Sequence, residues 1–369
     1  MMTVLDRRHL LTALGAGLVT APFLTIPARR AFAAGDFQQR LVAAEQSGKV
    51  SGLDALLVSR GGKLLFEHYG KGVNEDISRN TGDTVTFGPE VLHDLRSVSK
   101  SVVGLVYGIA LAQGKVPSPE AKLYEQFPEY ADLAKQPGRD KITIAHVLSM
   151  TLGLEWDELT VPYGSDLRNS EIAMEAAPDR FRFILGLPIV GEPGLTWTYC
   201  GAATAILGRL ISKGTGEKLP AYARRVLFDP MDFGPSEWAI SADGEPRAAS
   251  GCRLLPRDML KLGQLALAGG AWQGKQIVPA DWVKRITTPT VHIGGPRSYG
   301  YHWYIYDDMV DGRRQYWFGG IGWGGQKLYV FPGLDLVVAM NCGNYRKPGI
   351  EQNRVNIAVL NEVVFPSLT

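Results

Sequence analysis

The sequence predicts an α+β fold, in which one antiparallel sheet is flanked by helices and a helical subdomain is inserted into the chain that forms the sheet. Three observations support this prediction. Strand-like runs occur near both ends of the chain, the stretch between them is helical and loop-rich, and neighbouring strand-like runs are joined by short turns instead of helices. No G-x-G-x-x-G links a strand to a helix, so a doubly wound nucleotide-binding fold is disfavoured.

The elements near the amino end are a hairpin and a long helix. Two β-rich runs at 53–59 and 63–69 are joined by Arg60-Gly61-Gly62, which favours a tight turn. Apolar residues then recur with helical spacing over 97–113, and Gly114 is suited to end that helix.

The middle of the chain, from about 117 to 229, predicts short helices and loops, and the rest returns to sheet. Two helices are expected in the middle, at 144–150 and 202–213. Later runs predict strands at 299–306, 315–318, 326–331 and 336–341 and a closing helix over 352–363. We therefore expect a sheet subdomain from 34–116 and 236–369, with a helical subdomain at 117–235.

The composition is that of an ordinary soluble globular protein. Of its 369 residues 45% are hydrophobic, and 39 basic against 37 acidic side chains give a formal charge of +2. Such a balance provides no basic field for a nucleic acid. Six histidines and three cysteines without metal-ligand spacing predict neither a metal nor a cofactor.

Residues 1–33 are typical of a twin-arginine signal peptide. Arg7 and Arg8 precede a moderately apolar run to about Ile26, and Ala31-Phe32-Ala33 forms a small-x-small cleavage signal. The run is interrupted by glycine and proline and falls short of the ~18 apolar residues that a membrane span needs. We therefore expect export by the twin-arginine translocase to the periplasm or the medium, without a stable membrane span. An amphipathic helix that happens to contain two arginines is the alternative.

The chemistry-bearing motif is Ser97-Val98-Ser99-Lys100, the one S-x-x-K in the chain. It opens the helix predicted at 97–113, so the two side chains lie on one face, one turn apart. A desolvated lysine with a lowered pKa accepts a hydroxyl proton, as in serine–lysine hydrolases. The structural alternative is a serine at the helix N-cap and a solvated lysine.

Two further blocks follow in order. Pro193-Gly194-Leu195-Thr196-Trp197-Thr198-Tyr199-Cys200-Gly201 leads into the apolar helix at 202–213, and Gly322-Trp323-Gly324-Gly325-Gln326 introduces the strand at 326–331. With these motifs the chain resembles the serine β-lactamase and penicillin-recognising superfamily, in particular its class C-like esterases and 6-aminohexanoate-oligomer hydrolases. The blocks look like its S-x-x-K motif, its tyrosine motif and the W-G-G form of its K-T-G motif. The resemblance implies a β-lactamase/transpeptidase-like fold.

The resemblance also implies a catalytic role for each motif. Ser97 would be the nucleophile that forms an acyl-enzyme, Lys100 would activate it, and Tyr199, as a phenolate stabilised by Lys100, would be the partner base. The backbone N–H groups of Ser97 and Gln326 would form the oxyanion hole.

The substrate-binding expectations come from the same blocks. Gly324 and Gly325 would let the acyl group lie against the strand, and Trp323 would be an apolar wall. Gly201 stands where related lactamases have asparagine, and Trp323 stands where they have a lysine that holds a carboxylate. Both departures favour neutral esters, or amides recognised in another way, unless Arg253 or Arg257 supplies a cation.

The 6-aminohexanoate branch uses an extra tyrosine and acidic residues from the helical subdomain, which makes Tyr163 and Asp166 candidate substrate-binding residues. A solvated acidic loop is the favoured interpretation of the whole group, which comprises Glu155, Trp156, Asp157, Glu158, Tyr163 and Asp166.

The predicted function is therefore that of an exported serine hydrolase acting on an ester or amide. A β-lactamase, or a D,D-peptidase or D-amino-acid amidase acting on cell-wall-related substrates, is the enzymatic alternative. The non-enzymatic alternative is a penicillin-binding-like scaffold without catalytic activity, although such a scaffold has no chemical need of Ser97, Lys100 and Tyr199 together.

Overall fold

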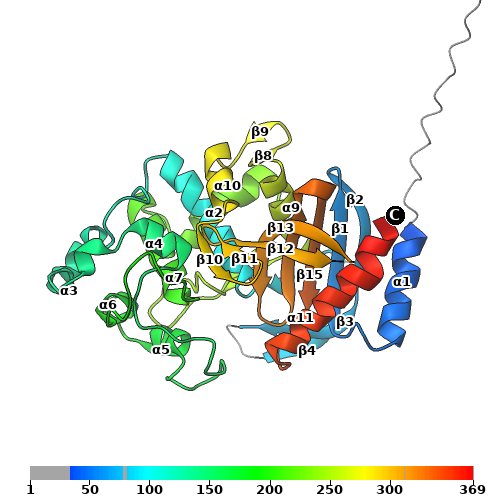
Figure 1. The fold of residues 1–369 in the computed structure, drawn as a ribbon, viewed down its shortest axis with the longest axis horizontal. Coiled ribbons are helices and arrows are strands. Elements are labelled where there is room, and N and C mark those ends of the chain that lie inside the picture. Colours follow the sequence, from blue (N-terminus) through cyan, green and yellow to red (C-terminus); the bar gives the residue numbers. More distant parts are fainter. Residues whose placement is uncertain (1–33, 78–80, 311, 369) are drawn as a thin grey trace, which may run out of the picture. The chain divides into compact units, whose positions relative to one another are not determined.

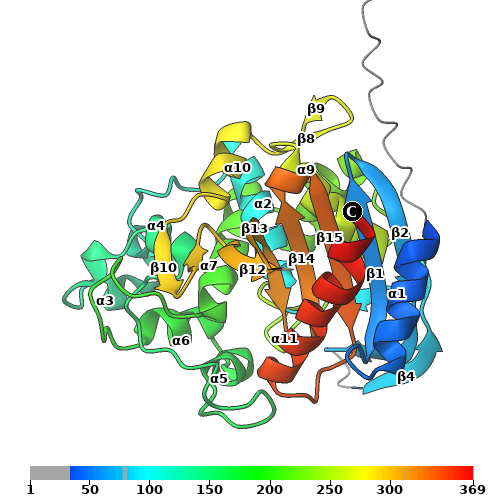
Figure 2. The same ribbon diagram turned by 45° about the vertical axis from the view of Figure 1, so that its right-hand side comes forward.

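The computed structural model describes residues 34–368 except 78–80 and 311. Within this part of the chain, an antiparallel sheet of eight strands has the order β10-β11-β12-β13-β14-β15-β1-β2. Strands from both ends of the chain therefore lie side by side, as predicted (Figures 1 and 2). The strands are β1 (Leu53–Arg60), β2 (Lys63–Tyr69), β10 (Val291–Gly294), β11 (Arg297–Tyr299), β12 (Tyr304–Val310), β13 (Arg313–Gly322), β14 (Gln326–Phe331) and β15 (Leu336–Cys342).

The strand predicted at 299–306 is wrong in one respect, because β11 and β12 are separated by a loop. His302 in this loop has a φ of 63°, and its backbone N–H donates to the carbonyl of Leu148 at 3.1 Å. A Cβ at Gly300 would lie 2.2 Å from the carbonyl oxygen of Ile286. The loop is therefore held against the helical part of the molecule by contacts that the local pattern does not contain.

The central strands divide the core into two layers. Ala55 and Leu57 of β1 pack in one cluster and Leu56 and Val58 in the other, as the alternation of side chains along a strand requires. The first layer is covered by α2 (Val98–Ala112), α9 (Pro256–Leu267) and α10 (Ala280–Ile286). The second is covered by α1 (Ala34–Gln46) and by α11 (Gly349–Ala358), which continues through η7 (Val359–Val364) and η8 (Phe365–Leu368).

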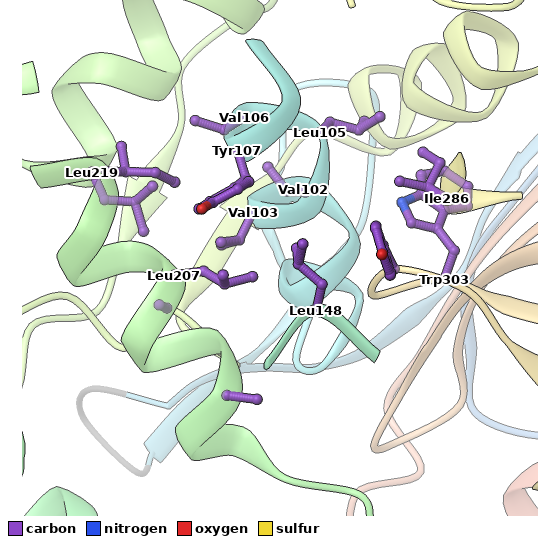
Figure 3. Close-up of a cluster of buried hydrophobic side chains, with 14 of the residues drawn as sticks. Val102, Val103, Leu105, Val106, Tyr107, Leu148, Leu207, Leu219, Ile286 and Trp303 are labelled. Atoms are coloured by element: carbon purple, nitrogen blue, oxygen red, sulfur yellow. The ribbon is translucent and has the colours of Figure 1, made fainter. Parts of the chain in front are cut away.

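Helix α2 lies at the centre of the larger core. Its residues from Val98 to Ala110 are buried on every side, which is typical of a helix that is apolar all round. Figure 3 shows its side chains between Leu207 of the neighbouring helix on one side and Trp303 on the other. A Cβ at Gly108 would lie 2.0 Å from the Trp282 ring, so this helix packs closely against α10.

The middle of the chain is helical, as predicted, and in its described residues the strand pairing is limited to isolated bridges. The boundaries of the two subdomains stay predictions. The α-helices here are α3 (Ala131–Ala134), α4 (Ile144–Ser149), α5 (Ser170–Ala176), α6 (Arg180–Gly186), α7 (Gly201–Thr215) and α8 (Leu219–Ala223). Other short helical segments are η1 (Tyr124–Gln126), η2 (Pro128–Tyr130), η3 (Arg139–Lys141), η4 (Arg224–Phe228) and η5 (Asp229–Met231).

Several short strands were not predicted, because two- to six-residue strands carry little periodicity. They form three small sheets, β3 (Lys71–Asp76) with β4 (Thr81–Thr86), β5 (His93–Asp94) with β7 (Cys252–Leu254) and β6 (Glu237–Trp238), and β8 (Ala271–Trp272) with β9 (Lys275–Gln276). A last short helix, η6 (Pro332–Leu334), connects β14 to β15.

The predicted signal peptide lies outside the described residues. Across the described ranges, no helix has the length and apolar character that crossing a membrane requires. The three cysteines are free and buried, as small apolar side chains often are.

Candidate active site

Ser97 lies at the N-cap of α2, immediately after a strained residue. Arg96 has a φ of 48°, a left-handed conformation that costs a non-glycine residue roughly 1–2 kcal/mol. Its side chain is held on three sides, by Glu75 at 3.2 Å, by Asp94 at 3.4 Å and by the ring of Tyr345 at 4.6 Å. These contacts stabilise the sharp turn that presents Ser97 at the start of the helix.

The three predicted catalytic residues come together around Lys100. Its Nζ donates to Ser97 Oγ at 3.1 Å and to the carbonyl of Ala249 at 3.1 Å. It also lies 4.7 Å from the centroid of the Tyr199 ring. Lys100 is 3% exposed and Tyr199 is 8% exposed, so both act in a largely water-free environment.

The charge state of Lys100 differs from the expectation. Burial acts to lower the pKa of Lys100, but the negative charges around it outweigh burial and raise that pKa well above its ordinary value. The groups whose negatively charged forms raise it are Tyr199, Glu158 and Glu171, in decreasing order of effect. Lys100 is therefore an ammonium at neutral pH and serves as a hydrogen-bond donor. The expected lowered pKa was wrong, because Tyr199 and, to a smaller extent, two glutamates that the sequence did not place beside Lys100 outweigh the effect of burial.

Tyr199 is the remaining candidate for the base. Burial raises the pKa of Tyr199, while the ammonium of Lys100 and a contact with Ser97 act in the opposite direction. The net shift is upward, so the neutral phenol predominates in the resting site instead of the expected phenolate. The phenolate is the minor form, and the Lys100 ammonium is the group that favours it.

Glu158 is buried, and each of its carboxylate oxygens accepts hydrogen bonds. Oε2 accepts from the backbone N–H of Gly201 at 2.7 Å and from Trp156 Nε1 at 2.7 Å, and Oε1 accepts from the Tyr163 hydroxyl at 3.0 Å. With Glu158 2% exposed and Trp156 8% exposed, the interpretation of the whole segment as a solvated acidic loop was wrong.

Glu171 explains why position 201 is a glycine. A Cβ at Gly201 would lie 1.8 Å from Glu171 Oε2, so this carboxyl group fills the space that a side chain would need. Glu171 Oε2 is buried and has no hydrogen-bond partner among the described residues. Burial and the charge of Glu158 raise the pKa of Glu171 to about 8, against the opposing charge of Lys100.

Glu171→Gln is expected to stabilise the protein increasingly as the pH rises from 4.5 to 8. The unfolded carboxyl loses its proton near its ordinary pKa of 4.5, whereas the folded one keeps it to about 8. The native state therefore binds more protons across this window, and wild-type stability falls with rising pH by at most about 1.4 kcal/mol per pH unit. Denaturant unfolding at several pH values measures the difference. Glu155→Gln, at an exposed position, is the control, and a difference that is independent of pH would contradict the shift.

The role of Gln326 as second oxyanion donor stays a prediction. Gln326 is fully buried and does not line the pocket beside Ser97, and its side-chain Nε2 donates to the carbonyl of Cys342 at 2.6 Å on the neighbouring strand. Pairing between β12 and β13 stops at Gly319, so residues 320–322 have β14 on one side and an open edge on the other. A Cβ at Gly322 would lie 2.5 Å from the carbonyl oxygen of Leu95. The open edge is therefore next to the turn that carries Ser97.

A pocket of about 200 Å³ adjoins these groups. On the catalytic side it is lined by Ser97 and Tyr199, and its aromatic wall includes Tyr163 and Trp323. These two rings lie 5.9 Å apart between centroids, and Trp323 is 38% exposed. The predicted apolar wall and extra tyrosine thus both reach the pocket.

Other predicted substrate-binding residues are placed elsewhere. Asp166 does not line the pocket and instead pairs with the exposed Arg168 at 2.6 Å. Gly324 donates its backbone N–H to Gln352 at 2.8 Å and does not line the pocket, whereas Gly325 does. Gly201 donates its backbone N–H to Glu158, as described above, and does not line the pocket.

The cation in the pocket is also not one of those expected. Arg253 pairs with Glu237 at 2.6 Å and Arg257 with Glu67 at 2.6 Å, away from the pocket lining. Lys327 lines the pocket instead. No cluster of metal-ligating side chains occurs in the described ranges.

Comparison with known proteins decides the family. The beta-lactamase family model matches residues 37–359, which includes the serine, tyrosine and tryptophan blocks. The chain belongs to the beta-lactamase family. The resemblance seen in the sequence and the expected fold class are both confirmed.

Several proteins that resemble this chain are named as hydrolases. A 6-aminohexanoate-dimer hydrolase of Paenarthrobacter ureafaciens is 27% identical over 318 residues, covering 81% of this chain and 74% of that one. The structure of EstCE1, a hydrolase with promiscuous acyltransferase activity, has a TM-score of 0.66 at 16% identity and covers 87% of this chain and 99% of its own. A penicillin binding protein from Bacillus halodurans has a TM-score of 0.65 at 20% identity, with coverage of 86% and 98%. The chain is thus a beta-lactamase-fold member of a hydrolase family.

Proposed function

We propose that this protein is a serine hydrolase that cleaves a carboxylic ester or amide through an acyl-enzyme on Ser97. One observation carries the proposal. A buried ammonium, Lys100, donates to Ser97 Oγ at 3.1 Å beside the ring of Tyr199, and the serine and the tyrosine open onto one pocket.

The acylation step uses Tyr199 as the base. The Ser97 oxygen attacks the substrate carbonyl carbon while the Tyr199 phenolate accepts the serine proton. The tetrahedral intermediate then collapses, the bond to the alcohol or amine breaks, and Tyr199 gives the proton to the departing group. Lys100 stays an ammonium throughout, orients Ser97 and stabilises the phenolate.

Deacylation repeats these roles with water. Water attacks the acyl carbon, Tyr199 accepts its proton, and Ser97 leaves with a proton from Tyr199. The negative charge on the carbonyl oxygen needs two donors. The N–H of Ser97 at the start of α2 is one, and we assign the other to the open edge of β13 at residues 320–322.

An ester or an amide fits this mechanism equally. The relative from Paenarthrobacter is named for an amide, the 6-aminohexanoate dimer, and EstCE1 is named a hydrolase with acyltransferase activity. The expected preference for neutral substrates rested on a pocket without a cation. Lys327 lines this pocket, so the expected preference for neutral substrates loses its basis.

A fluorophosphonate probe is expected to label one peptide, the one that contains Ser97. Ser97→Ala should abolish labelling and lower kcat by about 10³-fold or more. Ser101→Ala is the matched control, because Ser101 lies in the same helix but donates to the carbonyl of His302 at 2.9 Å. Mass spectrometry of digested protein gives the site. Labelling at another residue, or undiminished labelling of Ser97→Ala, would refute the proposal.

Export by the twin-arginine pathway is part of the proposed function and rests on the sequence of residues 1–33. Replacing Arg7 and Arg8 with lysine is expected to retain the protein in the cytoplasm, since the pathway reads the arginine pair. Cell fractionation followed by immunoblotting measures this. Unchanged export of the double variant would argue against the pathway.

A further inference from the structure

Tyr345 lies in the loop that follows β15 and contacts both segments that carry the proposed oxyanion donors. On one side its ring lies 4.6 Å from the Arg96 guanidinium, and Arg96 directly precedes Ser97. On the other side its backbone carbonyl accepts from Trp323 Nε1 at 2.8 Å, and its hydroxyl accepts from Gln326 Nε2 at 3.2 Å. Tyr345 does not line the pocket, so any effect it has on the reaction passes through these neighbours.

The neighbours on the second side adjoin the open edge of β13. Trp323 directly follows Gly322, the last residue of that strand, and Gln326 is the cross-strand partner of Gly322 in β14. Tyr345 bonds to the side chains of both. It therefore restrains the end of the open edge from two directions.

The turn between β13 and β14 is shaped around the Tyr345 ring. Gly324 in this turn has a φ of 89°, a conformation that favours glycine. An added Cβ at this position would lie 2.5 Å from Tyr345 Cδ1. The backbone and the ring are thus in direct contact, and Gly324 makes room for Tyr345 beside the site.

The loop that carries Tyr345 is anchored to a segment outside the site. Gly343 donates its backbone N–H to the carbonyl of Gly52 at 2.9 Å, and Asn344 Nδ2 donates to the carbonyl of Ser51 at 2.9 Å. Ser51 and Gly52 directly precede β1. The main sheet therefore holds the ring in place, so that the ring is a fixed support for the groups it contacts.

We propose that Tyr345 is a positioning residue that sets the distance between the two oxyanion donors. This inference rests on the proposed function, because it concerns the N–H of Ser97 and the open edge of β13 assigned there. The face of an aromatic ring attracts a guanidinium, so Tyr345 adds to the ion pairs of Arg96 with Glu75 and Asp94 that hold the strained turn. The same ring packs against the turn after β13, so one rigid group spans two segments that are distant in the sequence.

The effect of such a support falls on the transition state. Negative charge on the carbonyl oxygen develops as the tetrahedral intermediate forms, and donors stabilise it only from well-defined positions. A misplacement of about 1 Å can lower a rate about 10²-fold. Acylation and deacylation both pass through such an intermediate, so both steps slow together. We therefore expect a disturbed support to lower kcat and to leave KM nearly unchanged.

Tyr345→Leu is expected to lower kcat for a p-nitrophenyl ester about 10- to 100-fold and to leave KM within a few-fold. Tyr345→Phe keeps the ring and should restore kcat to within a few-fold of the wild type. Tyr130→Leu is the matched control, because Tyr130 is also half-buried and stacked on an arginine, Arg182 at 5.2 Å, but does not line the pocket. It should leave kcat unchanged. An unchanged kcat in Tyr345→Leu, a loss confined to KM, or an equal loss in Tyr345→Phe would overturn the role of the ring.

A second background separates positioning from general damage to the fold. Glycine adopts a φ near 48° without strain, so in Arg96→Gly the turn before Ser97 no longer depends on the ring. Tyr345→Leu should therefore cost less kcat in Arg96→Gly than in the wild type. An equal cost in both backgrounds would contradict the proposed support of the Ser97 turn.

The fluorophosphonate probe distinguishes failure of this inference from failure of the proposed function. If the probe labels wild-type Ser97 while Tyr345→Leu keeps its kcat, the proposed function stands and the role of Tyr345 is wrong. If wild-type Ser97 resists the probe, the proposed function itself is wrong.

Discussion

Lys100→Ala and Tyr199→Phe are each expected to lower kcat by about 10²- to 10⁴-fold, and the double variant is expected to lose little more than either single one. The reason is their mutual dependence. Without the ammonium, burial keeps Tyr199 protonated, and without the phenol, Lys100 has no base to assist. Groups that act as one unit give non-additive losses.

Steady-state kinetics on one p-nitrophenyl ester measures this cycle. Tyr107→Phe is the control for loss of a buried tyrosine hydroxyl, because that hydroxyl donates to the carbonyl of Pro117 at 2.7 Å in the core and not in the pocket. It should leave kcat within a few-fold. If the losses in the Lys100 and Tyr199 variants multiply, the two residues work separately. A falling kcat/KM at lower pH in the wild type is also expected, since protonation removes the phenolate.

Gly201→Ala is expected to lower both activity and the free energy of unfolding. Its Cβ would lie 1.8 Å from Glu171 Oε2 and 2.6 Å from Glu171 Cδ. Because this carboxyl group is buried, it must move against close-packed surroundings, and overpacking of this kind typically costs about 1–3 kcal/mol. The shift also disturbs the backbone N–H of Gly201, which donates to Glu158 at 2.7 Å, and so the charges around Lys100.

A double variant separates the steric cause from other effects of alanine. Glu171→Ala removes the clashing carboxyl, so Gly201→Ala should cost much less stability in that background than in the wild type. Denaturant unfolding of the four proteins gives the coupling energy. Gly186→Ala is the control, since a Cβ at Gly186 meets no atom within 4 Å. An equal cost of Gly201→Ala in both backgrounds would contradict the steric explanation.

The parts of the fold that could be predicted from sequence are those with a strong local period. β2 and β14 have the predicted bounds, and β1, α2 and α7 differ from them by one or two residues. Their apolar residues recur with a regular period over enough residues to distinguish strand from helix. The small sheet of β3 and β4 was not predicted, because its strands are half-exposed and polar and are held by each other instead of by a core.

The candidate site also has a part that could be predicted from sequence and a part that could not. Ser97 and Lys100 meet because three residues in a helix span one turn, a local property that sequence alone determines. Glu171 and Lys327 gave weaker signals. Gly201 stands where related lactamases have asparagine, which leaves space that another side chain can fill, and Lys327 is a lone charge in an apolar strand. Neither signal named the partner, since the two contacts join residues far apart in the chain.

Sequence by itself determined the family, the fold class, and the serine, lysine and tyrosine that the site brings together. Tertiary structure decided their protonation states, which carboxyl groups surround Lys100, which backbone edge faces Ser97 and which cation reaches the pocket. The physical reason is that a pKa depends on burial and on charges a few ångströms away. In this protein Glu158 lies in the loop before α5, Glu171 in α5 and Lys327 in β14, and only folding brings these three groups to the site.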